Sequence, residues 1–270
     1  MRKLSWVLAV VAMLVAGSSA TAFADGGFKS VEFPTAGGIK ARADVYESKD
    51  ESAALILLFH QAGWSRGEYR EIAPKLVAFG YRVMAVDQRS GGGVNGVRNE
   101  THTRAAKKGL AHDYLDAYAD LEAALAYARK ELKAKRVVVW GSSYSASLVF
   151  RLTAEHPVEV TAAMAFAPGE YFQKQGPTYI QDFAKRVKQP VFVTSSKKER
   201  AQVKPIFDAA PAEKKILFTP ASKGAEKKIL FTPASKGQHG SRALWDKWPD
   251  SDVYWAAVNG FLEEYAPPAP

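Results

Sequence analysis

Cysteine is absent from the 270-residue sequence. This absence excludes disulfide bonds and a lipid anchor on cysteine, so the hydrophobic core must hold the fold by itself. A metal-binding pattern is also missing, because the five histidines and the acidic residues show no spacing typical of a metal site. We therefore expect neither disulfide bonds nor a metal ion in the folded protein.

Acidic residues are fewer than basic ones, and the formal net charge is +9 at pH 7. An excess of positive charge raises the question of a nucleic-acid ligand. The lysines, however, are spread along the chain, and their short clusters are interleaved with acidic residues. No basic stripe with stacking aromatic residues is present in the sequence. We expect a solvated basic surface and no nucleic-acid partner.

Residues 1–24 have the pattern of an export signal. Two basic residues precede an apolar stretch at residues 4–16, and the Ala-Phe-Ala of residues 22–24 resembles a signal-peptidase site. The apolar stretch is short for a membrane span, which needs about 20 apolar residues. We predict cleavage before Asp25. One domain over residues 25–270 would then be periplasmic or secreted, without membrane attachment.

Short apolar runs alternate with helical patterns along most of the remaining chain. The opening segments, residues 31–33 and 39–46, alternate apolar and polar residues around two glycines and predict an antiparallel hairpin. Later runs predict strands buried on both faces at residues 54–59, 81–86, 136–140, 161–166, 191–194 and 215–218. Helical spacing lies between them, notably at residues 72–78 and 114–132. The sequence therefore predicts an α/β fold, with a mostly parallel central sheet and helices on both faces.

Residues 212–224 (AEKKILFTPASKG) are repeated letter for letter at residues 225–237. This identity indicates a recent tandem duplication, because an old structural repeat would have diverged. Each copy contains one strand-like KKILFTP unit, whereas the fold needs a single strand at this place. We expect the second copy, with Ile229, Leu230 and Phe231, to form the strand while the first bulges out. This arrangement keeps the following loop short, and a surface insertion costs little loop-closure entropy.

A serine stands at a predicted strand-to-helix turn. The segment WGSSYSA, residues 140–146, follows an apolar strand and precedes a helical pattern. It resembles the G-x-S-x-G nucleophile elbow, in which a strained turn lifts the serine hydroxyl above the sheet. Gly141 and Ser145 occupy the two positions that must be small, so a serine replaces the second glycine. Ser143 is the candidate nucleophile, and the alternative interpretation is an ordinary serine N-cap.

The nucleophile requires a base and an acid that orients the base, and with such an elbow both follow the serine, the acid first. Only His156 and His239 follow Ser143. His156 ends the helix after the elbow, whereas His239 lies in a glycine-flanked loop after the last predicted strand, where the base belongs. Glu199, after the preceding predicted strand, is the preferred acid, and Glu170 is the alternative.

Two backbone N–H groups must stabilise the oxyanion that forms during acyl transfer. One donor is Tyr144, the residue after the nucleophile. The other should come from the loop after the strand at residues 54–59, where Ala62 is the first choice and Gln61 the second. His60 in the same loop is interpreted as a structural histidine, because the base is already assigned.

Together these motifs resemble the dienelactone-hydrolase-like branch of the α/β-hydrolases. The matching elements are LLFHQAGWSRGEY (residues 57–69), DQR (87–89), the elbow, SKKE (196–199) and GQHG (237–240). The resemblance implies hydrolysis of a small-molecule ester or lactone through an acyl-enzyme, without a cofactor. Trp64, Arg89 and Tyr171, together with Arg98, lie on loops that we expect over the site and are candidates for substrate binding.

Residues 91–96 (GGGVNG) match the G-x-G-x-x-G dinucleotide fingerprint after a predicted strand. Charged residues follow instead of an immediate apolar helix, so we expect a flexible loop and no nucleotide cofactor. Two functional alternatives stay open. One is a non-catalytic binding protein of the same fold, disabled by the duplication beside His239, and the other is a peptidase.

Deleting residues 212–224 tests whether the duplication impairs the enzyme. We expect activity equal to or modestly above that of the full chain and stability unchanged or improved, because the base keeps its place beside the serine. Ester turnover and thermal unfolding of the two chains measure both quantities. A gain in activity by orders of magnitude would show instead that the duplication displaces His239.

Overall fold

The computed structural model describes residues 27–211, 215–218 and 236–268. The predicted export signal and most of the duplicated segment lie outside these ranges. Within the described ranges, no helix combines the length and the apolar character that a membrane span requires.

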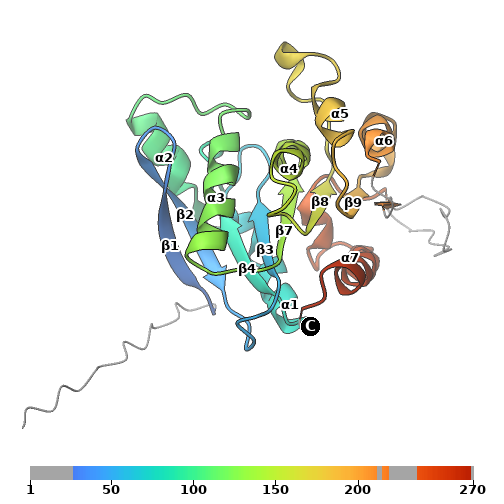
Figure 1. Cartoon of the computed structure of the whole chain (residues 1–270), viewed down its shortest axis with the longest axis horizontal. Helices are drawn as coiled ribbons and strands as arrows, with labels where there is room; N and C mark the ends of the chain where they lie inside the picture. Colours follow the sequence, from blue (N-terminus) through green and yellow to red (C-terminus); the bar gives the residue numbers. More distant parts are fainter. Residues whose placement is uncertain (1–26, 212–214, 219–235, 269–270) are drawn as a thin grey trace, which may run out of the picture.

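An eight-stranded sheet forms the centre of the molecule, in the order β1-β2-β4-β3-β7-β8-β9-β10 (Figure 1). Its strands are β1 (Lys29–Thr35), β2 (Ile39–Tyr46), β3 (Leu55–Phe59), β4 (Arg82–Val86), β7 (Val137–Ser142), β8 (Ala162–Phe166), β9 (Val191–Thr194) and β10 (Lys215–Phe218). β2 is antiparallel to both β1 and β4, and all other neighbours are parallel. The predicted hairpin and the predicted strands are therefore confirmed, and every residue of β3, β4, β7, β8 and β9 is buried.

Helices cover both faces of this sheet, as the sequence predicts. The α-helices are α1 (Ile72–Ala78), α2 (Glu100–Lys107), α3 (Tyr118–Lys130), α4 (Tyr144–Glu155), α5 (Tyr179–Ala184), α6 (Arg200–Ala209) and α7 (Ser251–Tyr265). Short 3-10 turns are η1 (Arg66–Tyr69), η2 (Gln173–Gln175), η3 (Lys197–Glu199) and η4 (Ser241–Leu244). α3 and α4 pack on one face through residues such as Leu121 and Leu148, and α1 and α7 pack on the other through Ile72 and Phe261. The loops at the carboxyl ends of the parallel strands carry the candidate site residues.

The last strand comes from the first copy of the duplicated segment. β10 runs parallel to β9 with Lys215 opposite Val191 and Phe218 opposite Thr194. The prediction that the second copy forms this strand is therefore wrong. The two copies are identical, so side-chain preference cannot choose between them. The first copy follows α6 after only a few residues, and the second copy then stands in the chain between β10 and His239.

The glycine-rich segment forms a small hairpin instead of the expected flexible loop. β5 (Gly93–Val94) pairs antiparallel with β6 (Val97–Arg98). Between them Asn95 and Gly96 have φ values of 50° and 73°, the left-handed conformations that a tight Asn-Gly hairpin turn requires. α2 then begins at once, and its N-cap Asn99 accepts a hydrogen bond from the His102 N–H at 2.8 Å. The Asn-Gly dipeptide at residues 95–96 is the sequence signal that favours this turn.

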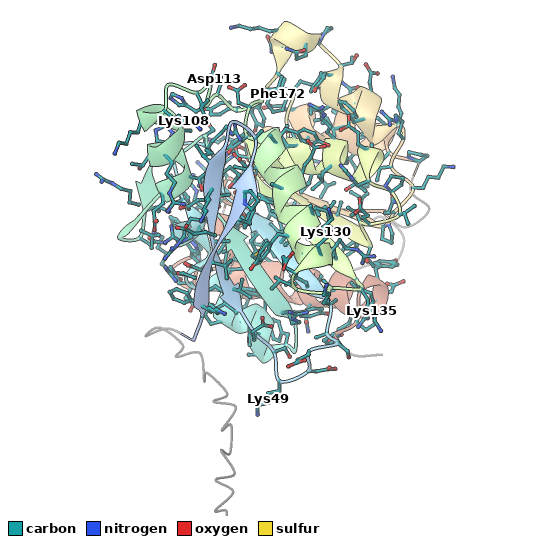
Figure 2. The ribbon with its side chains drawn as sticks, turned by 60° about the vertical axis from the view of Figure 1, so that its left-hand side comes forward. Lys49, Lys108, Asp113, Lys130, Lys135 and Phe172 are labelled. Atoms are coloured by element: carbon teal, nitrogen blue, oxygen red, sulfur yellow. The ribbon has the colours of Figure 1, made fainter. Side chains whose placement is uncertain are left out.

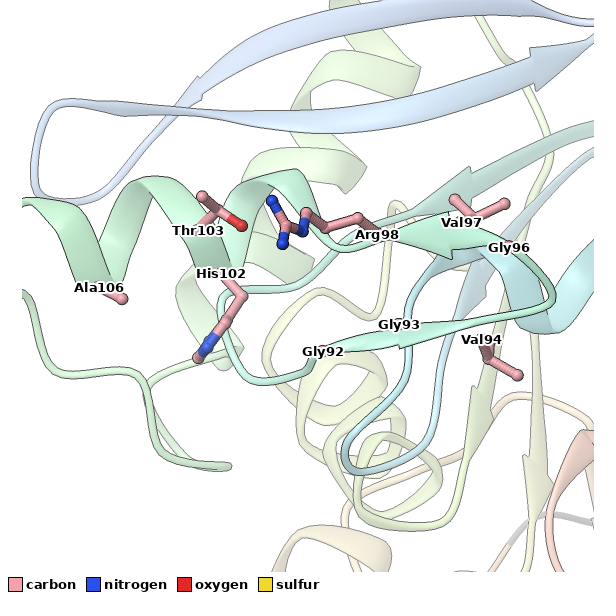
Figure 3. A pocket seen from close by; sticks show the side chains of 9 residues that line it. All are labelled: Gly92, Gly93, Val94, Gly96, Val97, Arg98, His102, Thr103 and Ala106. Carbon is pink, nitrogen blue, oxygen red and sulfur yellow. The ribbon is translucent and has the colours of Figure 1, made fainter.

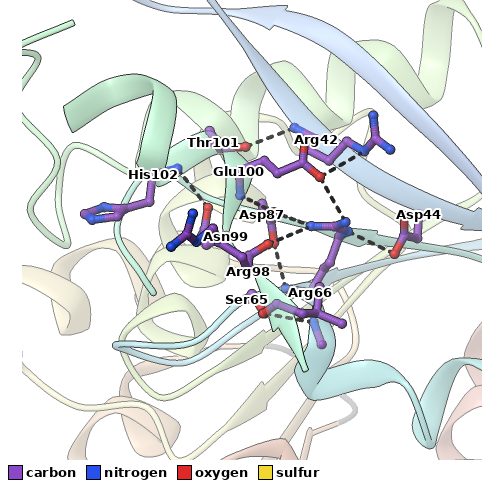
Figure 4. Close-up of polar contacts among 12 residues, drawn as sticks. Arg42, Asp44, Ser65, Arg66, Asp87, Arg98, Asn99, Glu100, Thr101 and His102 are labelled. Carbon is purple, nitrogen blue, oxygen red and sulfur yellow. Dashed lines mark hydrogen bonds and ion pairs between the residues drawn. The ribbon is translucent and has the colours of Figure 1, made fainter. Parts of the chain in front are cut away.

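A buried cluster of charges ties the opening hairpin to the parallel strands (Figure 4). The Arg66 guanidinium, on η1, donates to Asp44 at 2.9 Å and to Asp87 at 2.6 Å, and it lies 3.3 Å from Glu100. Burial raises the pKa of Asp87 to about 6, although the Arg66 charge opposes this. Charges at this depth are tolerated because each has partners of opposite sign. The cluster fixes η1, which also carries a residue of the candidate site.

The remaining basic residues include many that face solvent. Figure 2 shows Lys49, Lys108, Lys130 and Lys135 on separate parts of the surface, and all four are exposed.

Candidate active site

Ser143 occupies the sharp turn between β7 and α4. Its backbone has φ 61° and ψ −120°, a conformation that non-glycine residues rarely adopt. Its N–H donates to the Phe166 carbonyl of β8 at 2.8 Å. Strain of this kind costs about 1–3 kcal/mol and is enforced by surrounding structure, often at functional sites. The Ser143 side chain makes no cap hydrogen bond to α4, so the arrangement is that of an elbow and not of a simple N-cap.

The close approach of β7 and α4 explains the small residues on either side of Ser143. A Cβ atom on Gly141 would lie 2.3 Å from the Ser145 carbonyl oxygen, so this position requires glycine. Ser145 replaces the second glycine of the motif, and its hydroxyl forms hydrogen bonds. The hydroxyl donates to the Phe59 carbonyl at 2.7 Å and accepts from the Ser142 N–H at 2.8 Å. The serine therefore joins the end of β3 to the turn without disturbing it.

His239 and Glu199 form a direct pair. His239 Nδ1 lies 2.5 Å from Glu199 Oε1, and the loop of Glu199 leaves the end of β9. Burial raises the pKa of Glu199, but hydrogen bonds from His239 and Ser196 outweigh it and lower the pKa to about 2. Glu199 is thus a carboxylate at neutral pH. Its acceptor oxygen makes Nδ1 the protonated nitrogen of a neutral His239 and leaves Nε2 as an acceptor.

Glu170 is turned toward different partners. Its carboxylate accepts from the Ile180 N–H at 2.8 Å and from the Gln181 N–H at 2.9 Å, so it caps the first turn of α5. The structure thus brings Glu199, and not the alternative Glu170, to His239.

The loop of His239 is fastened to the elbow despite the duplication before it. The Ser241 N–H donates to Ser142 Oγ at 2.9 Å, and a Cβ atom on Gly240 would lie only 2.4 Å from the same oxygen. His239 is therefore held between the acid loop and the residue that precedes Ser143. Use of the first copy as the strand does not carry the histidine away from Glu199.

The expected oxyanion donors differ in availability. Tyr144 begins α4, where the first N–H groups of a helix have no acceptor within the helix. The Gln61 N–H donates to the buried Glu68 carboxylate at 2.8 Å and is committed there. Ala62, the next residue of the same loop, therefore stays the first choice for the second donor.

His60 is a structural histidine, as its sequence context indicates. It is fully buried, its Nδ1 lies 2.9 Å from the Gln61 carbonyl, and its Nε2 accepts from the Gln88 N–H at 3.2 Å. Burial lowers its pKa to about 4, so the ring is neutral. The imidazole holds the loop after β3 against the loop after β4.

Tyr171 contacts the candidate nucleophile. Its hydroxyl donates to the Ala167 carbonyl at 3.1 Å and also hydrogen-bonds with the Ser143 side chain. Burial raises the Tyr171 pKa, the Ser143 contact lowers it, and the Glu199 charge raises it. The neutral phenol therefore lies beside the Ser143 hydroxyl.

Trp64 lies near Arg242, which contacts the loop of His239. Its ring stacks on Trp245 at 5.3 Å between centroids, and the Arg242 guanidinium is 5.9 Å from its centroid. Arg242 Nε donates to the His239 carbonyl at 3.1 Å. An aromatic surface and a positive charge therefore border the loop of the base.

Arg89 does not face a substrate, and its predicted role is wrong. The buried guanidinium forms a two-fold contact with Asp120 at 2.9 and 2.8 Å and donates to the Ala36 carbonyl at 3.0 Å. Its charge is used to join the opening hairpin to α3. Arg98, by contrast, is exposed and lines an open groove of about 740 Å³ between the β5–β6 hairpin and α2 (Figure 3).

Sequence reasoning missed Glu68 and Arg242. Glu68 in the sequence GEY is indistinguishable from an ordinary acid in a first helical turn, and Arg242 stands among unremarkable surface residue types. Only the fold brings them to the elbow and to His239. Among the described residues, no group of three or more histidines and acids is arranged to hold a metal ion.

A mostly parallel sheet with a serine on a strained strand-to-helix turn defines the α/β-hydrolase class. Residues 50–224, more than half of the chain, match the family described as serine aminopeptidase, S33. The chain belongs to this family of α/β-hydrolases. Among curated proteins, no sequence matches it.

Solved structures agree on the fold. An esterase from Pyrococcus furiosus is 17% identical with a TM-score of 0.61, covering 88% of this chain and 93% of its own. A dienelactone hydrolase from Anabaena variabilis is 15% identical with a TM-score of 0.64, covering 88% and 98%. Est1E from Butyrivibrio proteoclasticus is 14% identical with a TM-score of 0.62, covering 87% and 98%. The predicted resemblance to the dienelactone-hydrolase-like branch is confirmed at the level of the fold.

Gly141→Ala tests the close approach that creates the elbow. The added Cβ would overlap backbone atoms of Ser145, which cannot rotate away, so we expect a loss of on the order of 3 kcal/mol in the free energy of unfolding. Gly260→Ala in α7 is the matched control, because its Cβ would meet open space. It should leave stability unchanged or raise it by up to about 1 kcal/mol. Equal unfolding midpoints in denaturant for both variants would contradict the argument.

Proposed function

We propose that the protein is a serine hydrolase that cleaves carboxylic ester or lactone bonds with Ser143, His239 and Glu199 as its triad. The observation that carries the proposal is the 2.5 Å contact of His239 and Glu199, on a loop fastened beside the strained turn of Ser143. A protein that only bound a ligand would not require an oriented base at such a turn.

The first half of the reaction acylates the serine. With its Nδ1–H directed at Glu199, His239 accepts the Ser143 hydroxyl proton on Nε2 while Ser143 Oγ attacks the carbonyl carbon. The Glu199 carboxylate stabilises the imidazolium that forms. The N–H groups of Tyr144 and Ala62 stabilise the oxyanion. The imidazolium then protonates the leaving alcohol, and the acyl group stays on the serine.

The second half hydrolyses the acyl-enzyme. His239 takes a proton from a water molecule, the resulting hydroxide attacks the acyl carbon, and collapse of the intermediate returns the proton to Ser143 Oγ. The carboxylic acid leaves, and one water has been consumed. The same base serves both halves, so its orientation by Glu199 matters twice.

The surroundings of His239 favour an ester over the α-amino group that an aminopeptidase recognises. The Arg242 guanidinium lies against Trp64 and donates to the His239 carbonyl, so positive charge borders the site. An ammonium group nearby would be repelled. The named esterase and dienelactone hydrolase with the same fold support this choice. The predicted signal at residues 1–24 makes activity in the periplasm or outside the cell part of the proposal.

Ser143→Ala is the direct test of the nucleophile. We expect hydrolysis of p-nitrophenyl esters to fall by on the order of 10³-fold or more, and fluorophosphonate labelling to disappear, with an unchanged circular dichroism spectrum. Amino-acid p-nitroanilides provide the peptidase arm. Labelling that persists in the alanine variant would remove Ser143 from this role, and an unlabelled, inactive wild type would favour a binding protein.

Glu199→Gln and Glu170→Gln separate the two acids. Glu199→Gln removes the charge that fixes the His239 tautomer, so we expect turnover to fall by on the order of 10³-fold or more. Glu170→Gln keeps one acceptor at the start of α5 and should retain turnover within about threefold. Steady-state kinetics on one ester measure both, and the reverse ranking would move the acid to Glu170.

A further inference from the structure

Glu68 is a fully buried carboxylate beneath the site, and the mechanism above does not use it. It lies on η1, and among the described residues no salt bridge reaches its carboxylate. Neutral donors satisfy it instead. Oε1 accepts from Ser142 Oγ at 2.7 Å, and Oε2 accepts from the Gln61 N–H at 2.8 Å. A buried charge held only by neutral donors is costly, so its presence calls for a reason.

These contacts reach all three loops of the site. Gln61 precedes the proposed oxyanion donor in the loop after β3, and Ser142 precedes the nucleophile. Ser142 Oγ in turn accepts from the Ser241 N–H at 2.9 Å, two residues after His239. One carboxylate therefore connects the oxyanion loop, the elbow and the loop of the base.

The directions of the protons make this connection depend on charge. Ser142 has a single hydroxyl hydrogen, which it donates to Glu68, while its oxygen accepts from Ser241. A proton on Glu68 Oε1 would compete with the Ser142 hydrogen for the same contact. A proton on Oε2 would weaken that oxygen as the acceptor of the Gln61 N–H. The ionised carboxylate accepts both hydrogen bonds more strongly than the protonated acid.

We propose that Glu68 is a positioning residue whose ionised carboxylate holds the oxyanion loop, the elbow and the histidine loop in the reactive arrangement. This inference rests on the proposed function. It predicts two groups that must lose a proton for activity, because His239 must be neutral to act as the base and Glu68 must be charged to hold it in place.

The requirement that Glu68 be ionised falls near neutral pH. Burial raises the pKa of Glu68 to about 7, although hydrogen bonds from Ser142 and Gln61 lower it. The groups that face it are Arg242 from η4, which lowers the pKa, Tyr69 from η1 and Tyr144 from α4. Burial raises the pKa of both tyrosines well above 10, so they stay neutral. Acidification below about pH 7 therefore protonates Glu68 and loosens the three loops.

The test is the pH profile of p-nitrophenyl acetate hydrolysis and of fluorophosphonate labelling. For the wild type, log(kcat/KM) should fall toward low pH with a slope that exceeds 1 where Glu68 is protonated, because loss of its charge adds a drop of roughly 10–100-fold to that caused by protonation of the base. Glu68→Gln keeps the shape of the side chain but removes its titratable proton. The slope of log(kcat/KM) against pH for this variant should therefore be about 1. At high pH its kcat should be lower by roughly 10–100-fold, with KM changed by less than about twofold, because the loops are misplaced.

Glu71→Gln is the matched control, an exposed acid three residues along the chain. It should keep the wild-type rate and the wild-type slope. Ser142→Ala removes the acceptor of the Ser241 N–H. In the double variant, the losses of activity caused by Ser142→Ala and by Glu68→Gln should be less than additive.

A wild-type slope that nowhere exceeds about 1 overturns the proposal, and this result needs no variant to fold. An unchanged slope in a folded Glu68→Gln variant overturns it as well. Absence of labelling in the wild type at every pH would instead reject the proposed function.

Discussion

The backbone of β7 passes so close to the start of α4 that a single added carbon on Gly141 would overlap the Ser145 carbonyl. This contact is the constraint on which the site depends. It forces the chain to reverse within one residue, and Ser143 takes the left-handed φ that the reversal requires. The hydroxyl is thereby lifted off the sheet, and the neighbouring loops are built around it. Ser145 shows that the constraint concerns size and not identity, because a serine fits when its hydroxyl finds partners at the end of β3.

Two buried ionisable residues of opposite sign, Arg66 and Glu68, lie on the same short turn, η1. They differ in the kind of partner that each one has. Arg66 is paired with Asp44 and Asp87, which anchors the turn to the sheet. Glu68 has only neutral donors, which link it to the loops of the site. The pKa values of Glu68 and Glu199 are shifted in opposite directions. Contact with His239 and Ser196 lowers the pKa of Glu199 to about 2, whereas burial raises that of Glu68 to about 7. Glu68 is fully buried without a charged hydrogen-bond partner, whereas Glu199 is only partly buried and contacts His239, so depth and partners together set the two pKa values.

Much of the fold could be predicted from local patterns. Short apolar runs marked the buried strands because a strand covered on both faces has no polar face to show. The order of serine, acid and histidine pointed to Glu199 and His239, which the structure brings together. The errors have physical causes of their own. The loop position of Arg89 predicts a role in substrate binding, but Asp120 on α3 binds its guanidinium. The choice of copy for β10 cannot be predicted from side chains, because two identical segments differ only in the lengths of chain before and after them.

The sequence by itself determined the strands, the strand-to-helix turn at Ser143 and the requirement for a small residue at Gly141, because these depend on neighbours a few positions away. Only the tertiary structure decided which acid faces His239, whether the Gln61 N–H is available to an oxyanion, and where Glu68 points. Those outcomes depend on hydrogen bonds between residues far apart in the chain, such as Glu68 with Ser142 and Ser142 with Ser241. Such contacts leave no periodic trace in the sequence, since any buried donor or acceptor at the right place in space would satisfy them.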